Sequence, residues 1–332
     1  MANTTSLVLL NTSITKPFGY CEKLQPFLDM NIRKKLPQFY VITSLTACIF
    51  LSILCFFALF LNAVVVFVTW RTPALHSPRN ILLCSLAATD FFVGFTAQPF
   101  FVVAEMFLLF GKLDKYCLTV FMHFYSSWLF NGISFLTLTT ISYERYLALR
   151  FHLRYTELIT ASRVIITVVI YWLIWAALVT ILWFWAMSKL LAYALTAVCI
   201  ILGVISLRCL ALIHKTVKRH KKHVRDTNQR TFQSMIRYRR STNTMIILVA
   251  AFALSYFPFV ITTAISASQE QEDLRTSSVH CLAVAIMFAN SSINPVIYFW
   301  RVTELREAAK RTLRKFHPIK AKRRTDTEFD TR

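Results

Sequence analysis

The sequence predicts an all-α membrane protein, a bundle of seven transmembrane helices followed by a short amphipathic C-terminal helix. Of its 332 residues 56% are hydrophobic, its apolar residues gather into seven runs almost free of charge, and its basic residues concentrate in alternate connections. A helix of about 20 apolar residues crosses the hydrocarbon core of a bilayer. The runs are residues 36–69, 80–104, 116–143, 164–188, 190–207, 241–269 and 276–300.

The fourth and fifth runs are separated only by Lys189, so we compared one long helix with two. A single helix over residues 164–207 would be roughly 66 Å long at about 1.5 Å per residue. That is about twice the ~30 Å thickness of the hydrocarbon core. We therefore expect the chain to reverse near residues 187–189.

The basic residues predict the orientation of the bundle. They follow the third, fifth and seventh runs, at Arg150 and Arg154, within residues 215–240 and within 301–324. Loops rich in Lys and Arg stay in the cytoplasm. We expect a plasma-membrane protein divided into an extracellular tail at 1–40, a seven-helix domain at 41–300, an amphipathic interfacial helix at 301–316 and a cytoplasmic tail at 317–332.

The net charge of +21 is mostly loop charge, which would lie beside an anionic lipid leaflet. Because the basic runs lack interleaved aromatic residues, we expect membrane lipid as a partner and no nucleic acid. In the amphipathic segment, Val302, Leu305, Ala309 and Phe316 lie roughly on one side, as in helices that rest on the inner interface.

The predicted extracellular side carries candidate modifications. Asn3 and Asn11 begin glycosylation sequons in the outer tail. Five of the eight cysteines fall in apolar runs, whereas Cys21, Cys117 and Cys281 fall on the outer side, where disulfides can form. We favour a Cys21–Cys281 pair and leave Cys117 open.

Polar residues of three runs fall at one depth. Counted from the cytoplasmic ends of their helices, Asp90, Ser134 and Asn290 each lie about 15–16 Å deep. A carboxylate in hydrocarbon needs partners or water. One interpretation is a purely structural hydrogen-bonded cluster. The other is a water-filled pocket in which Asp90 binds a sodium ion, because hard cations prefer oxygen ligands; no other cofactor is expected.

The last run has a polar face and a proline. Asn290, Asn294 and Tyr298 follow i, i+4, i+8 spacing, and Ser291 flanks that face. Pro295 lies in this run and Pro258 in the sixth, and proline kinks a helix. Either proline alone is as consistent with a passive bend as with a hinge; together with the polar layer, hinges are favoured.

A charge pair closes the third run at its cytoplasmic end. Glu144, Arg145 and Tyr146 follow a stretch without Lys, Arg, Asp or Glu. Ionisable groups at this depth are costly unless they meet water or a partner. We expect a cytoplasmic partner to contact Arg145.

In order along seven spans, these motifs resemble those of class A (rhodopsin-like) G-protein-coupled receptors over roughly residues 40 to 316. Each motif alone is weak, but the ordered set is highly specific. The motifs are LNAVV at 61–65, LAATD at 86–90, ERY at 144–146, Phe252 with SYFP at 255–258, and NPVIY at 294–298.

The resemblance implies a receptor that activates a heterotrimeric G protein. Arg145 would pair with Glu144 at rest and meet the Gα subunit when the sixth helix moves outward, while Tyr298 swings inward. Tyr256 would act at the hinge of the sixth helix. The resemblance also implies a sodium and water pocket formed by Asp90, Ser134, Asn290, Ser291 and Asn294.

Several positions depart from the family pattern. Cys117 precedes the usual helix-three cysteine position, Tyr256 replaces the usual tryptophan, and the fifth helix lacks its proline. No acid lies near Tyr238 to hold Arg145 at rest, which predicts basal activity. The short second outer loop and the fifth helix are similar to those of melanocortin, lysophospholipid, cannabinoid and adenosine receptors.

The ligand is not identified by the sequence. Ser127 stands where amine receptors carry an aspartate, and Phe288 stands where opsins carry a lysine. We expect an uncharged or lipid-like ligand, although helix packing explains any single lining residue equally well. By helix phase the outer cavity would be lined by His123, Ser127, Trp128, Asn131, Tyr256 and Thr263.

Two other classes of protein were weighed. A membrane hydrolase would need clustered His and acidic ligands for a metal, and the few such residues within the runs are scattered, so we do not expect an enzyme. A transporter that uses Asp90 as an ion site is the alternative function, but it would show inverted repeats, and none is visible.

Overall fold

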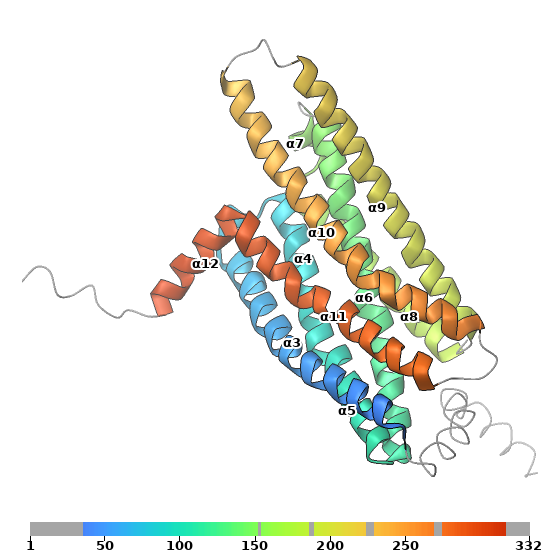
Figure 1. Ribbon diagram of the computed structural model, residues 1–332. Coiled ribbons are helices and arrows are strands. Elements are labelled where there is room, and N and C mark those ends of the chain that lie inside the picture. The colour runs from blue at the N-terminus through green and yellow to red at the C-terminus, as the bar shows by residue number, and fades with distance from the viewer. Residues whose placement is uncertain (1–35, 152–153, 186–188, 224–228, 269–273, 317–332) are drawn as a thin grey trace, which may run out of the picture.

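The computed structural model describes residues 36–151, 154–185, 189–223, 229–268 and 274–316. Asn3, Asn11, Cys21 and the tail at 317–332 therefore lie outside the described residues. Within them the chain forms a bundle of long helices (Figure 1). In chain order the elements are α3 (Gln38–Arg71), η2 (Pro73–Leu75), α4 (Pro78–Phe92), η3 (Val93–Ala97), α5 (Gln98–Leu109), α6 (Leu113–Arg150), α7 (Tyr155–Leu158), α8 (Ala161–Trp185), α9 (Lys189–His223), α10 (Gln229–Ser268), α11 (Leu274–Arg301) and α12 (Thr303–Phe316).

The predicted seven-helix architecture is confirmed. Six spans in the described part of the chain are long and apolar enough to cross a membrane: α3, α4 to α5, α8, α9, α10 and α11. The seventh, α6, carries many Ser, Thr and aromatic residues and contacts α4, α5, α8, α9 and α10. Because α6 is surrounded by other helices, its polar side chains can meet partners instead of lipid.

The fourth and fifth runs form two helices, as expected, while the reversal expected near residues 187–189 falls on residues that lie outside the described ones. α8 ends at Trp185 and α9 begins at Lys189, so one continuous helix is excluded. A tight connection joins α5 to α6 at Gly111, whose φ of 68° is left-handed. Glycine adopts this conformation without the strain that a Cβ atom adds.

The second membrane span is interrupted in a way that the sequence did not predict. α4 starts with Ser77 as a cap and Pro78 in its first turn, and it passes through the π-helical turn η3 into α5. Within η3, the Gly94 carbonyl accepts a hydrogen bond from the Cys55 thiol at 3.0 Å. A Cβ atom on Gly94 would lie 3.0 Å from the Ala58 Cβ, so glycine lets α3 and η3 pack closely.

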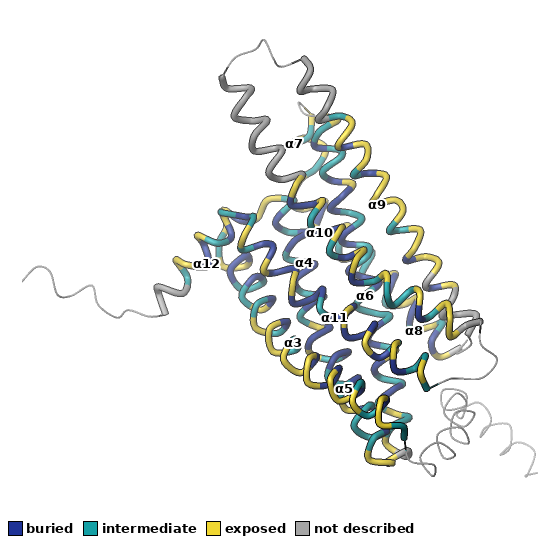
Figure 2. Tube along the Cα trace, in the orientation of Figure 1, coloured by how far each residue is buried: buried dark blue, intermediate teal, exposed yellow. Residues whose placement is uncertain are grey.

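Burial follows the bundle geometry. Figure 2 shows buried residues on the inward faces of the helices and exposed residues on their outward faces. Large apolar side chains such as Phe56 and Leu254 are exposed, which suits a surface covered by lipid. α11 is the most deeply buried of the six apolar spans.

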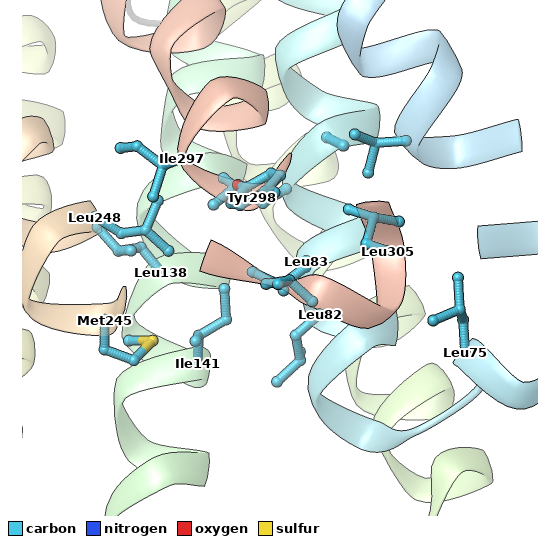
Figure 3. Close-up of a cluster of buried hydrophobic side chains, with 14 of the residues drawn as sticks. Leu75, Leu82, Leu83, Leu138, Ile141, Met245, Leu248, Ile297, Tyr298 and Leu305 are labelled. Carbon is cyan, nitrogen blue, oxygen red and sulfur yellow. The ribbon is translucent and has the colours of Figure 1, made fainter. Parts of the chain in front are cut away.

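The half of the bundle next to α12 holds the largest hydrophobic cluster among the described residues (Figure 3). Leu82, Leu138, Leu248 and Tyr298 bring four helices together there. Leu305 of α12 joins the same cluster, and Val302 and Ala309 are also buried. The predicted amphipathic helix is therefore confirmed, and its apolar face anchors it to the bundle.

The favoured disulfide is wrong. Cys281 is a free thiol in the part of the chain that the structure describes, whereas Cys117 is disulfide-bonded. Cys281 is 4% exposed and packs among Leu51, Val284 and other core residues of α3 and α11. A cysteine facing this core points away from the outer loops, which residue counting along the chain does not reveal.

We predict that Gly132→Ala destabilises the bundle. A Cβ atom there would lie 2.1 Å from Cε2 and Cζ2 of Trp175, a side chain that is 4% exposed. Overpacking costs about 1–3 kcal/mol, so we expect the melting temperature to fall by about 5 °C. Gly203→Ala is the matched control, because no atom lies within 4 Å of its added Cβ. Equal melting temperatures for the two variants would contradict this packing.

Candidate functional site: the switch and the polar layer

The C-terminal end of α6 holds a charge pair between neighbouring residues. Arg145 donates from Nε to Glu144 Oε2 at 2.5 Å and from its Nη2 to Oε1 at 2.7 Å. The two side chains are 13% and 4% exposed. Because both carboxylate oxygens accept from one guanidinium, the pair has the fork geometry of strong ion pairs.

A second donor fixes the carboxylate of Glu144. The Tyr155 hydroxyl, from the short helix α7 in the loop after α6, donates to Glu144 Oε1. Tyr146, the third residue of the predicted motif, accepts instead from Arg150 at 2.6 Å. The sequence did not single out Tyr155, because a contact between a loop and a helix leaves no periodic signal.

Arg79 is a further residue near the switch that the sequence analysis missed. It lies in the first turn of α4 and interacts electrostatically with Arg145, Glu144 and Glu304. The C-terminal end of α6 and the first turn of α4 thus bring two guanidinium groups near one buried carboxylate. The only sequence signal for Arg79 was its position immediately before an apolar run.

The predicted polar layer is partly assembled around Asp90. Asn294 Nδ2 donates to Asp90 Oδ2 at 2.8 Å, and the Ser291 hydroxyl interacts with the same carboxylate. Asp90 is 1% exposed, so these contacts offset part of the cost of its burial. Ser134 reaches the layer indirectly, since its hydroxyl donates at 2.9 Å to Thr89, the neighbour of Asp90.

Two amides complete the layer. Asn62 of α3 donates to the Ser291 carbonyl at 2.9 Å and to the Ala58 carbonyl at 2.8 Å, which ties α3 to α11. The Oδ1 atoms of Asn62 and Asn290 are buried without a partner among the described residues. The layer therefore offers oxygen atoms that protein groups do not use.

Tyr298 lies on α11, about one turn beyond Asn294 of this layer. Its side chain is fully buried, and its hydroxyl has no hydrogen-bond partner within the described ranges. Figure 3 shows the ring enclosed by the hydrophobic cluster near Leu83 and Ile297. A buried hydroxyl without a hydrogen-bond partner is destabilising. A rearrangement that gives the Tyr298 hydroxyl a partner would remove this cost.

The predicted hinge of the sixth helix is built from three rings. Tyr256 and Phe252 of α10 stack at 4.4 Å, and Phe135 of α6 meets their edges at 4.8 and 4.4 Å. Pro258 lies inside α10 two residues after Tyr256, and Pro295 lies inside α11. The contact links α10 to α6 directly above the hydrophobic cluster.

The predicted ligand residues divide into two groups. His123 and Ser127 are buried on α6, and Asn131 and Tyr256 are half-buried. Thr263 is half-buried on α10, and its hydroxyl has no partner in the described part of the chain. Trp128 packs instead against the cluster formed with Trp175 of α8, whose indole N–H donates to the Trp128 carbonyl at 3.1 Å.

Glu105, on α5, is a carboxylate that the sequence did not single out. Its Oε2 accepts from the Ser44 hydroxyl at 2.6 Å and from the Tyr40 hydroxyl at 3.2 Å. These bonds join α5 to α3. The residue closed the second charge-free run, which was the signal that could have drawn attention to it.

A groove lies between η2 and α12, at the end of α3. It has a volume of about 740 Å³ and is lined by residues of both charges, including Arg71, Glu304, Glu307 and Arg311. The mixed charge gives the groove no net preference for an anion or a cation.

Comparison with known proteins agrees with this geometry. The family described as "7 transmembrane receptor (rhodopsin family)" matches residues 61–192 and 183–298. Trace amine-associated receptor 7b of Rattus norvegicus is 30% identical over 270 residues, which cover 71% of this chain and 73% of the relative. Trace amine-associated receptor 9 of Homo sapiens is 27% identical over 271 residues, 73% of this chain and 76% of the relative.

A third relative is not a trace amine-associated receptor. Melanopsin of Branchiostoma belcheri is 25% identical over 288 residues, which cover 76% of this chain but 40% of that longer protein. The chain belongs to the rhodopsin family of seven-transmembrane receptors. It is a multi-pass membrane protein and a G-protein-coupled receptor; the transporter alternative is not favoured.

We predict that Glu144→Gln raises basal G-protein activation. The change removes the negative charge that holds Arg145, and a hydrogen bond to a charged group contributes about 1.5–3 kcal/mol. We expect basal nucleotide exchange to increase about tenfold or more, measured in membranes at equal receptor density. Glu157→Gln is the control, because Glu157 is exposed in the same loop region. A basal rate in Glu144→Gln no higher than wild type would refute the holding role.

Proposed function

We propose that this receptor lies in the plasma membrane with its N-terminus outside and signals by releasing Arg145 from Glu144. Once released, Arg145 contacts the α-subunit of a heterotrimeric G protein. The observation that carries the proposal is the buried two-point contact between these side chains at 2.5 and 2.7 Å. Asn3 and Asn11 would then be available to glycosylation outside the cell.

The sixth helix supplies the movement in this proposal. α10 contains no Asp or Glu over its whole length, so no carboxylate of its own ties it to Arg145. Pro258 and the stacked rings of Phe252 and Tyr256 form the pivot, with Pro295 as a second pivot in α11. Outward motion of α10 would let Tyr298 leave its apolar surroundings and swing toward Arg145.

The ligand binds, in this proposal, in the outer half of the bundle near His123 and Ser127, and is uncharged or lipid-like. Ser127 offers no charge to an ammonium group. The rings of Phe101, Phe124 and Phe288 around His123 favour an apolar ligand body. Ligand outside and G protein inside would bias the same two packings of the bundle.

The layer around Asp90 is proposed to bind sodium. Its support is the donor set: one carboxylate, the hydroxyls of Ser134 and Ser291, and amide oxygens of Asn62 and Asn290 that lack partners among the described residues. Asn294 already donates to Asp90 and would hold the carboxylate in place. Oxygen-rich sites of this kind suit hard cations.

We predict that Arg145→Ala abolishes G-protein activation and leaves surface expression largely intact. Without the guanidinium, the proposed contact with the α-subunit is lost, so both basal and stimulated exchange should fall to the level of membranes without receptor. Nucleotide exchange and cell-surface labelling measure the two effects. Arg71→Ala is the control, since this cytoplasmic arginine lies over the ring of Phe67, away from the switch. Unchanged signalling in Arg145→Ala would remove the proposed mechanism.

We predict that Asp90→Asn lowers the sodium sensitivity of the receptor. Replacing the carboxylate removes the charge that attracts the cation. The measurement compares receptor-dependent nucleotide exchange in sodium chloride and in N-methylglucamine chloride at equal ionic strength. Glu105→Gln is the matched control, because that carboxylate is held by α3 hydroxyls in the outer half. Equal sodium sensitivity in Asp90→Asn and wild type would count against the cation site.

A further inference from the structure

One face of α6 presents a row of polar side chains to the outer half of the bundle. His123, Ser127 and Asn131 are spaced four residues apart, so they share that face. His123 is 6% exposed and Ser127 is 9% exposed. Each step of four residues rises about 6 Å along the helix.

The hydrogen-bond roles of His123 follow from its one partner. Its Nδ1 lies 2.9 Å from the carbonyl oxygen of Ala97 in η3. A carbonyl can only accept, so Nδ1 carries the hydrogen, and in a neutral imidazole Nε2 is then an acceptor. No partner for Nε2 is present in the described part of the chain, and the ring is surrounded by Phe101, Phe124 and Phe288.

A second imidazole has the same arrangement. His280 Nδ1 lies 3.0 Å from the hydroxyl of Thr262, which itself donates to the Pro258 carbonyl at 3.0 Å. When that hydroxyl donates to the Pro258 carbonyl, its oxygen accepts from His280 Nδ1, and the Nε2 of His280 is then an acceptor. The two imidazoles, from α6 and α11, are close enough to interact electrostatically.

Ser127 differs from its neighbour in a way that points to a ligand. The Ser126 hydroxyl donates to carbonyls of its own helix, at 2.6 Å to Met122 and 3.1 Å to His123. The Ser127 hydroxyl is buried and has no partner among the described residues. Buried polar groups without partners are rare and destabilising, so a group that satisfies Ser127 on binding gains affinity.

The charge around this row limits the ligand class. Glu105, the carboxylate of the neighbouring α5, already accepts from Ser44 and Tyr40 of α3. The row itself holds only an imidazole, a hydroxyl and an amide. An ammonium group would therefore lose its water without meeting a negative charge, whereas a neutral donor would gain a hydrogen bond.

We propose that His123 and Ser127 recognise a neutral, largely apolar ligand through a hydroxyl or amide N–H that the ligand donates to His123 Nε2. Ser127 binds a second polar atom of the ligand about 6 Å further along α6. The inference rests on the proposed function, because it names the ligand class of the same receptor site. It specifies the donor that an uncharged ligand must carry.

The test uses the full chain in membranes, with receptor-dependent nucleotide exchange as the signal. The probes are oleyl alcohol and N-(2-hydroxyethyl)oleamide, each compared with its methylated mate that lacks the donor, oleyl methyl ether and N-methyl-N-(2-methoxyethyl)oleamide. The second probe carries a hydroxyl and an amide separated by a two-carbon linker, close to the step of about 6 Å between His123 and Ser127, whereas oleyl alcohol carries a single polar group. Oleylamine is the cationic comparison. One hydrogen bond is worth up to about tenfold in affinity, so each donor probe should act at about tenfold lower concentration than its mate.

The variants separate recognition from folding. In His123→Phe the difference between donor probe and methylated mate should fall to about onefold. Ser127→Ala should weaken N-(2-hydroxyethyl)oleamide about three- to tenfold and leave oleyl alcohol, which has no second polar atom, unchanged. This variant tests the site even where His123→Phe reaches the surface poorly. Ser126→Ala is the matched control and should leave every probe unchanged, because that hydroxyl is satisfied within its own helix.

The remaining outcomes contradict different claims. Inactive probes, equal potency within each pair, or activity of oleylamine alone would overturn the ligand class. The proposed function would still stand if wild type shows basal exchange that Arg145→Ala lacks. Wild type indistinguishable from Arg145→Ala with every probe would instead remove the proposed function itself.

Discussion

A guanidinium at the inner edge of a bilayer must be neutralised by a neighbour or reach water, and here Glu144 neutralises it. The pair lies at adjacent positions of α6, and Tyr155 of α7 holds the same carboxylate. α10 contains no Asp or Glu, so the carboxylate that holds Arg145 comes from α6 itself. The sixth helix is then held at rest mainly by packing, which a modest change in the outer half can shift.

The buried interior provides a physical route between the two ends of the receptor. The rings of Phe135, Phe252 and Tyr256 sit between the outer polar row and the hydrophobic cluster that encloses Tyr298. The layer around Asp90 joins α4 to α11 at the same level. Closely packed clusters switch between discrete arrangements more readily than they deform gradually. These contacts together therefore form the element that ligand and G protein would bias.

Much of the fold followed from the sequence, because membrane helices are specified by length, apolarity and the distribution of basic residues. Counting depth along the helices indicated a polar layer at Asp90, and the family resemblance added Asn294, which contacts Asp90. What sequence could not supply depends on rotation and close packing: the free, buried Cys281, the π-helical turn at Gly94, the contact of Tyr155 with Glu144, and the position of Trp128 against α8. Each of these is decided by which side of a helix faces its neighbour.

The most direct test of the central claim is an experimental structure of this receptor bound to a nucleotide-free heterotrimeric G protein. The account predicts that Arg145 has left Glu144 and contacts the α-subunit, with α10 displaced outward and Tyr298 moved toward Arg145. A complex in which both Arg145–Glu144 hydrogen bonds persist and the α-subunit does not touch Arg145 would contradict it.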